Sequence, residues 1–171
     1  EVIMSNPSFN DPEMQEIFEG FLIETGELLD NLSQDLMEIE NDPENLDLLN
    51  RIFRSAHTIK GTASFMGFDK ITEITHHGED ILNKLRRGEL KVTLPIIDVL
   101  LEVHDKVEKL VDNIKEGNSE TVDYTDTIKK IEVLKDPNAK VEDVEPAAND
   151  IKTSEGETKP SDIQNEAKTD L

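Results

Sequence analysis

Apolar residues recur at alternating spacings of three and four positions along most of the chain, a pattern typical of helices that bury one face. The clearest stretch has its apolar positions at Leu49, Ile52, Ala56, Ile59, Ala63 and Met66. Similar patterns precede and follow it, and no stretch shows the alternation of a half-buried strand. The chain is therefore predicted to be all-α.

Capping residues and glycines divide this pattern into helices. Capping side chains or first-turn prolines mark three starts, at Asp11-Pro12, Asp69 and Thr93-Leu94-Pro95. Glycines, which tolerate a left-handed backbone, mark three ends, at Gly67, Gly88 and Gly117. The expected helices cover residues 12–40, 44–66, 70–87, 93–117 and 126–134.

Four long amphipathic helices joined by short connections predict an antiparallel up-and-down four-helix bundle, because none of these helices would be stable alone. The shorter fifth helix is expected to pack alongside the bundle. Gly20 and Gly26 lie inside the first helix and are interpreted as packing features that let a neighbouring helix approach closely.

Composition adds a tail to this picture. The chain has 171 residues, of which 35% are hydrophobic and 4% aromatic, and this supports one modest core. From Asp136 onward there are ten acidic and four basic residues without helical periodicity, which is typical of a disordered acidic linker. We expect a flexible amino terminus over 1–10, a helical domain over 11–135 and the tail over 136–171.

The net charge of −21 argues against binding to a nucleic-acid backbone, which requires clustered lysines and arginines. A protein partner is the better expectation. The sequence also has no cysteine, no signal-like amino terminus and no apolar run of membrane-spanning length. These features favour a cytoplasmic protein that does not insert into a membrane.

The candidate chemistry centres on His57, which lies just beside the apolar face of the second helix. Lys60 and Gly61 follow it by three and four residues and thus lie on the same side of the helix. A positive charge and a missing side chain therefore flank the imidazole. Lys60 is suited to offset the charge of an incoming phosphoryl group, and Gly61 to give a bulky partner access.

The third helix carries His76 and Glu79 on one face. An antiparallel neighbour would bring that face against His57. A carboxylate at Glu79 that accepts the Nδ1 proton of His57 would fix the tautomer and leave the Nε2 lone pair outward as a nucleophile.

Other side chains are given simpler roles. His104 falls on the apolar face of the fourth helix and is expected to be a buried, hydrogen-bonded core residue, whereas His77 is expected to be solvated. The pair Arg86-Arg87 is interpreted as charge compensation at a helix end, with steering of an acidic partner as the alternative. Most of the apolar residues at the end of the second helix are expected in the core, with one of them free for docking: Phe65, Met66 and Phe68.

Several segments together resemble the histidine-phosphotransfer (HPt) domain at the amino terminus of CheA-type chemotaxis histidine kinases. The resemblance spans about residues 11–134, and the segments that carry it are Ile52-Phe53-Arg54-Ser55-Ala56-His57-Thr58-Ile59-Lys60-Gly61, Gly67-Phe68, Glu73-Ile74-Thr75-His76, Glu79 and Leu85-Arg86-Arg87-Gly88-Glu89. Thr62 and Ser64 depart from the family, whose members often have glycines there, and this affects the expected docking contacts rather than the nucleophile.

The resemblance implies a phosphoacceptor role for His57. A separate ATP-binding kinase domain, in another subunit, would phosphorylate it with ATP and Mg²⁺, and an aspartate of a response regulator would receive the phosphoryl group. Lys60, His76 and Glu79 would form the supporting hydrogen-bond network. The chain itself has no glycine-rich nucleotide-binding motif, so we expect it to hold no cofactor and to be inactive as a kinase alone.

Three other functions stay open at this point. A free-standing HPt protein would shuttle phosphoryl groups between two response regulators instead of belonging to a kinase. A helical metal-binding protein would use His76, His77, Glu79 and His104 as ligands. A purely structural helical adaptor would use none of them.

Overall fold

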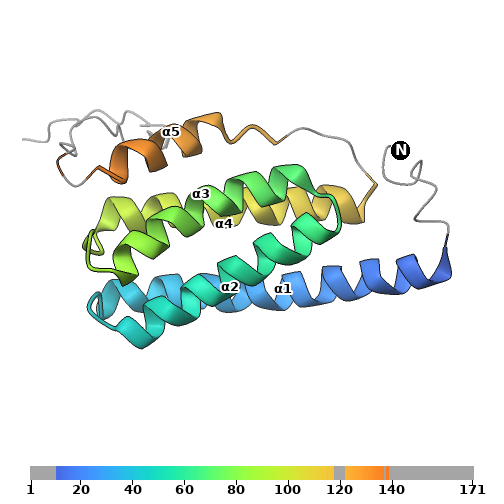
Figure 1. Cartoon of the computed structure of the whole chain (residues 1–171), viewed down its shortest axis with the longest axis horizontal. Helices are drawn as coiled ribbons and strands as arrows, with labels where there is room; N and C mark the ends of the chain where they lie inside the picture. The colour runs from blue at the N-terminus through green and yellow to red at the C-terminus, as the bar shows by residue number, and fades with distance from the viewer. Residues whose placement is uncertain (1–10, 118–121, 137, 139–171) are drawn as a thin grey trace, which may run out of the picture.

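The computed structural model describes residues 11–117, 122–136 and 138, which form five α-helices and no strand (Figure 1). The helices are α1 (Pro12–Asn41), α2 (Leu46–Phe65), α3 (Asp69–Arg86), α4 (Leu94–Lys115) and α5 (Thr125–Leu134). The all-α prediction is confirmed. The segments expected to be flexible, 1–10 and 136–171, lie outside the described residues except for Asp136 and Asn138.

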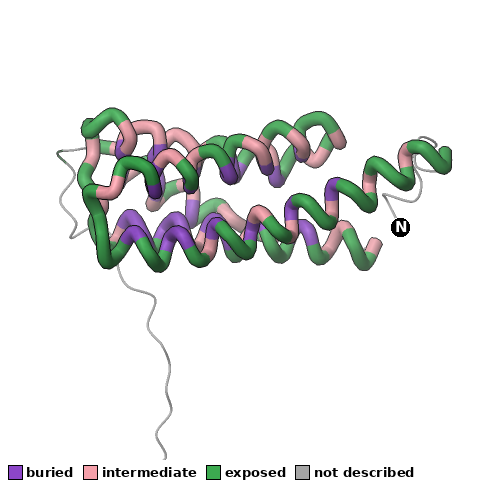
Figure 2. Tube along the Cα trace, turned by 90° about the horizontal axis from the view of Figure 1, so that it is seen from below, coloured by how far each residue is buried: buried purple, intermediate pink, exposed green. Residues whose placement is uncertain are grey.

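The first four helices form a closed ring in which each packs against the next along the chain and α4 packs back against α1. α5 lies outside this ring, against α3 and α4 (Figure 1). Buried positions face the space between the helices, and exposed positions face outward (Figure 2). The predicted four-helix bundle with a fifth helix alongside is therefore confirmed, and its core lies between α1, α2, α3 and α4.

Two of the five helices, α1 and α2, begin with a side-chain cap, whereas α3, α4 and α5 do not, so Thr93 lies at the cap position of α4 without capping it through its side chain. The Asp11 carboxylate accepts a hydrogen bond from the Glu13 backbone at 3.1 Å, and the Asn45 side chain accepts one from Leu48 at 3.0 Å. Asp69 was expected to cap α3, which is wrong, because the helix begins at Asp69 and Phe68 occupies the cap position without a side-chain cap. The Phe68 ring instead packs against aromatic rings of α1.

Gly67 ends α2 as predicted, with a positive φ of 76° that favours glycine. Its backbone N–H donates to the Ser64 carbonyl at 3.1 Å, and the next N–H, of Phe68, donates to the Ala63 carbonyl at 2.9 Å. This closing motif reverses the chain within a few residues. As a result α3 runs back along α2, and the faces that carry His57 and Glu79 adjoin.

Close approach between helices occurs at a glycine other than the two expected. A Cβ atom added at Gly78 in α3 would lie 3.2 Å from Val103 Cγ1 in α4, whereas one added at Gly20 or Gly26 would meet nothing within 4 Å. The interpretation of Gly20 and Gly26 as packing features is wrong, because a side chain at either position would find open space. Gly78 is therefore the glycine at which the missing side chain helps α3 and α4 to pack closely.

α5 is attached to the bundle by both apolar and charged contacts. Ile131 is fully buried, and Lys130 pairs with Glu102 of α4 at 2.6 Å. His77 Nδ1 of α3 lies 3.3 Å from Glu132 Oε1 of α5. His77 was expected to be solvated, which is wrong, because α5 covers it.

Among the described residues, no helix combines the length and the apolar character that crossing a bilayer requires.

Candidate functional site

α2 presents His57 to solvent while burying the residues around it. Ile52, Ala56 and Ile59 on the apolar face are at most 4% exposed, but the His57 side chain, one position after Ala56, is 61% exposed. One position along a helix turns a side chain by about 100°, which carries His57 from the core face to its edge. The imidazole is thus anchored on a rigid helix and open on one side.

Glu79 of α3 contacts this imidazole directly. His57 Nδ1 and Glu79 Oε1 are 3.1 Å apart, and the Glu79 side chain is only 13% exposed. The antiparallel packing of α2 against α3 brings together two residues that are 22 positions apart in the sequence. The contact expected from the sequence between these two side chains is present.

Lys60, one turn after His57 on α2, also contacts Glu79. Its Nζ lies 2.9 Å from Oε1 and 2.8 Å from Oε2 of the same carboxylate. Burial raises the pKa of Glu79, but the hydrogen bonds from Lys60 and His57 outweigh it, and the pKa is lowered below its ordinary value. Glu79 is therefore ionised at neutral pH.

The ionised carboxylate determines the tautomer of His57. A carboxylate oxygen only accepts hydrogen bonds, so the proton of the neutral imidazole must be on Nδ1 to make the contact with Oε1. The lone pair is then on Nε2, at the other end of the ring. The arrangement offers an exposed, oriented nitrogen nucleophile and an adjacent buried negative charge.

The structure does not bring His76 to this group. Its exposed ring lies on α3 with Nε2 4.0 Å from Asp80 and packs edge-on against His77. Within the described part of the chain, His76 therefore interacts with Asp80 and His77. Of the residues expected in the supporting network, Lys60 and Glu79 meet His57 and His76 does not.

The surface beyond His57 on α2 is open and partly apolar. Gly61 is exposed, and a Cβ atom there would meet nothing within 4 Å, so packing inside the described chain does not require this glycine. One turn further, Phe65 is 76% exposed. Met66 and Phe68 are partly buried against the core, so two of these three apolar residues belong to it and one is exposed, as the sequence predicts.

Two residues that lie beside His57 in the structure were not predicted there from the sequence. Phe53 stacks on the imidazole with its ring centroid 5.7 Å away and the planes 16° apart, and Arg86 Cζ lies 3.7 Å from the Phe53 ring centroid. The spacing of four residues between Phe53 and His57 is a visible signal of this stack. Nothing local indicates Arg86, which comes from the end of α3.

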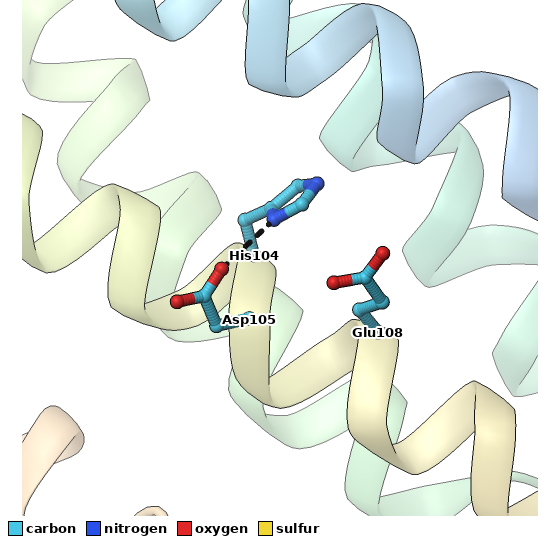
Figure 3. Close-up of side chains that lie close together, drawn as sticks. All are labelled: His104, Asp105 and Glu108. Carbon is cyan, nitrogen blue, oxygen red and sulfur yellow. Dashed lines mark hydrogen bonds and ion pairs between the residues drawn. The ribbon is translucent and has the colours of Figure 1, made fainter.

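His104 lies in the core, as predicted. Its Nε2 is 2.9 Å from the Leu29 carbonyl oxygen of α1, and its side chain is only 9% exposed. On its other side Nδ1 is 3.3 Å from Asp105, and Figure 3 shows Glu108 on the same stretch of α4. The ligand atoms of these three residues lie within 4.8 Å of one another, but both carboxylates are exposed and need no ion.

The alternative of a metal site made by His76, His77, Glu79 and His104 is not supported among the described residues. Glu79 is held by His57 and Lys60, and His77 by Glu132 of α5. His104 faces α1 instead of α3. Because each of these side chains has a different partner, the four cannot ligate one ion without a rearrangement of the bundle.

Known proteins resemble this chain across the described bundle. The family model of the Hpt domain matches residues 16–117. The sensor histidine kinase CheAY of Helicobacter pylori is 50% identical over 109 residues, which are 64% of this chain and 14% of that protein. The chain thus corresponds to a small part of this relative.

Two solved structures have the same fold. The solution structure of the histidine phosphotransfer domain of CheA matches with a TM-score of 0.64 and 35% identity, over 70% of this chain and 91% of that one. The phosphorylated P1 domain of CheA3 from R. sphaeroides, solved in complex with CheY6, matches with a TM-score of 0.60 over 68% of this chain and 93% of that one. At 19% identity, the second likeness concerns the fold alone.

Proposed function

The chain belongs to the Hpt domain family as a CheA-type phosphotransfer domain, and from that premise we propose that His57 is its phosphoacceptor. The observation that carries this proposal is the contact of 3.1 Å between His57 Nδ1 and Glu79 Oε1, which leaves Nε2 on the exposed side of the ring. His104, which is buried against α1, offers no such access.

The proposed reaction uses the Nε2 lone pair. Nε2 forms a bond to the γ-phosphorus of ATP while the bond from phosphorus to the bridging oxygen breaks, and ADP leaves with that electron pair. The Nδ1 proton stays on the ring, and the positive charge that the ring gains lies beside the Glu79 carboxylate. In the second step a carboxylate oxygen of an aspartate attacks phosphorus, and the N–P electrons return to Nε2.

Lys60 acts through Glu79 in this scheme. The sequence suggested that its amine offsets charge on the phosphoryl group. Its Nζ instead lies within 2.9 Å of both Glu79 oxygens and is only 22% exposed. Lys60 therefore keeps the carboxylate ionised and fixed, and so supports the Nδ1–H tautomer of His57.

The partners of the proposed reaction are two proteins. An ATP-binding kinase domain, in another subunit, supplies the phosphoryl group with ATP and Mg²⁺, and a response regulator receives it. The response regulator is proposed because the curated relatives are CheA proteins, and a P1 domain of the same fold, from CheA3, was solved in complex with CheY6. Within this chain we propose no resident cofactor.

A labelling experiment tests the proposal. We expect that a CheA kinase core with γ-labelled ATP gives this chain an acid-labile, alkali-stable label, as a phosphohistidine does. His57→Gln should remove the label, and His104→Gln, the matched control, should retain it. A label that persists in His57→Gln would overturn the assignment.

A further inference from the structure

A stack of side chains covers one side of the His57 imidazole. The Phe53 ring is nearly parallel to it, with the centroids 5.7 Å apart and the planes inclined by 16°. This separation lies within the range of favourable offset stacking between aromatic rings. The Arg86 guanidinium lies over the Phe53 ring, with Cζ 3.7 Å from its centroid, which is the geometry of a cation–π contact.

Arg86 is held in this position by both helices that form the site. One terminal nitrogen donates to Asn50 Oδ1 of α2 at 3.3 Å, and the other donates to Asn83 Oδ1 of α3 at 3.2 Å. Two fixed acceptors orient a planar guanidinium far better than solvent would. The charge compensation expected for Arg86 at the end of α3 does not require any of these contacts.

The stack supplies a constraint in addition to the one from Glu79. A single hydrogen bond at Nδ1 tolerates a range of angles, so the imidazole can still rock through small changes of its χ1 and χ2 angles while the contact with Oε1 persists. Such rocking changes the direction of the Nε2 lone pair. The nearly parallel ring of Phe53 limits it, because rocking the imidazole would disrupt the offset stack.

We propose that Phe53 and Arg86 are positioning residues for phosphoryl transfer at His57. Phe53 sets the plane of the imidazole, and Arg86 holds Phe53 against it. Together with Glu79 they define the direction of the Nε2 lone pair before a phosphodonor arrives. This inference rests on the proposed role of His57 as phosphoacceptor.

A small phosphodonor tests this role without a docking partner. With phosphoramidate, the Nε2–P bond forms as the P–N bond breaks, and ammonia leaves with the electron pair. We expect Phe53→Leu and Arg86→Met each to slow this reaction by about 5-fold, because the nucleophile is less well oriented. Phe53→Tyr, which keeps the ring, should restore the rate.

Arg87→Met is the matched control. Arg87 is the neighbouring residue, has the same charge and pairs loosely with Glu89 at 3.9 Å. This variant should react at the wild-type rate. With the kinase core, Phe53→Leu and Arg86→Met should lower kcat and leave KM unchanged, since their effect is on the orientation of the ring.

An NMR measurement separates orientation from loss of fold. In the wild-type chain the His57 ring protons should show the ring-current shift of a stacked aromatic ring, and Phe53→Leu should remove it while the amide spectrum stays dispersed. Folded variants with wild-type rates, or variants that change only KM, would overturn the positioning role. A label that survives in His57→Gln would instead overturn the phosphoacceptor assignment, and the NMR result would be unaffected.

Discussion

Two histidines of this bundle lie next to carboxylates, yet their surroundings give them opposite roles. His57 on α2 is 61% exposed and makes its short contact through Nδ1 with the partly buried Glu79. His104 on α4 is 9% exposed and makes its short contact through Nε2 with the Leu29 carbonyl. The first keeps its distal nitrogen accessible, whereas the second uses that nitrogen to join two helices.

The two histidines differ in how far the neighbouring carboxylate is buried. Glu79 is less exposed than His57, so it orients an exposed ring from the side of the core. Asp105 is 68% exposed and lies outside a buried ring. A buried carboxylate whose own charge is fixed by a lysine can determine a tautomer, whereas a solvated one has little influence. The contrast between a reactive and a structural histidine can be tested by paired variants.

The largest expected effect is on stability. His104→Ala should lower the free energy of unfolding by about 2–3 kcal/mol, because it removes buried packing and the hydrogen bond to Leu29. His57→Ala should lower it by less than about 1 kcal/mol, as expected for an exposed side chain. Urea unfolding followed by circular dichroism measures both. Equal losses of unfolding free energy in the two variants would contradict the difference between a buried structural histidine and an exposed one.

The next effect is on the rate of phosphorylation. Glu79→Gln should slow phosphorylation of His57 by about 10-fold or more, because an amide no longer fixes the Nδ1–H tautomer through a negative charge. Asp105→Asn, the corresponding change beside His104, should leave the rate unchanged. The measurement is the initial rate of labelling by the kinase core. A wild-type rate in Glu79→Gln would remove Glu79 from the mechanism.

A smaller effect is expected at the surface next to His57. Phe65 is 76% exposed on α2, and we expect it to contact the incoming response regulator. Phe65→Ser should weaken the affinity for that partner by about 5-fold, as the loss of an exposed apolar contact would. Leu94→Ser, at another exposed apolar residue on α4, is the control, and titration calorimetry gives both affinities. Equal affinities for all three proteins would exclude this surface.

The smallest effect is on the pH dependence of stability. The pKa of Glu79 is lowered below its ordinary value of 4.5 in the folded chain, so its interactions stabilise the fold above that pH. This contribution should be lost as the pH falls through the lower, folded-state pKa. The difference in unfolding free energy between the wild type and Glu79→Gln, measured from neutral to acid pH, should therefore shrink in acid. A difference that does not change with pH would contradict the charged contact.

The sequence predicts the fold well because helical periodicity and helix ends are local properties. The apolar faces of α2 and α3 are buried as their spacing indicates, and Gly67 ends α2 with a left-handed backbone. The burial of His104 also follows from its place on an apolar face. The buried faces follow from a regular backbone with 3.6 residues per turn, and the end at Gly67 follows from the freedom of glycine to adopt a positive φ.

The sequence is less informative where several residues have similar local patterns. His76 and Glu79 share a face of α3, and both were expected beside His57, but only Glu79 meets it. His77 was expected in solvent, but α5 covers it. Such outcomes depend on the axial offset and the crossing of neighbouring helices, which the whole core determines.

By itself, the sequence determined five helices, the faces they bury and an exposed histidine followed by Lys60 and Gly61. Only the tertiary structure decided that Glu79 but not His76 meets His57, and that Arg86 lies over the Phe53 ring beside His57. The physical reason is that burial follows from the repeat of one helix, whereas a contact between helices requires two helices to be placed within about an ångström of each other.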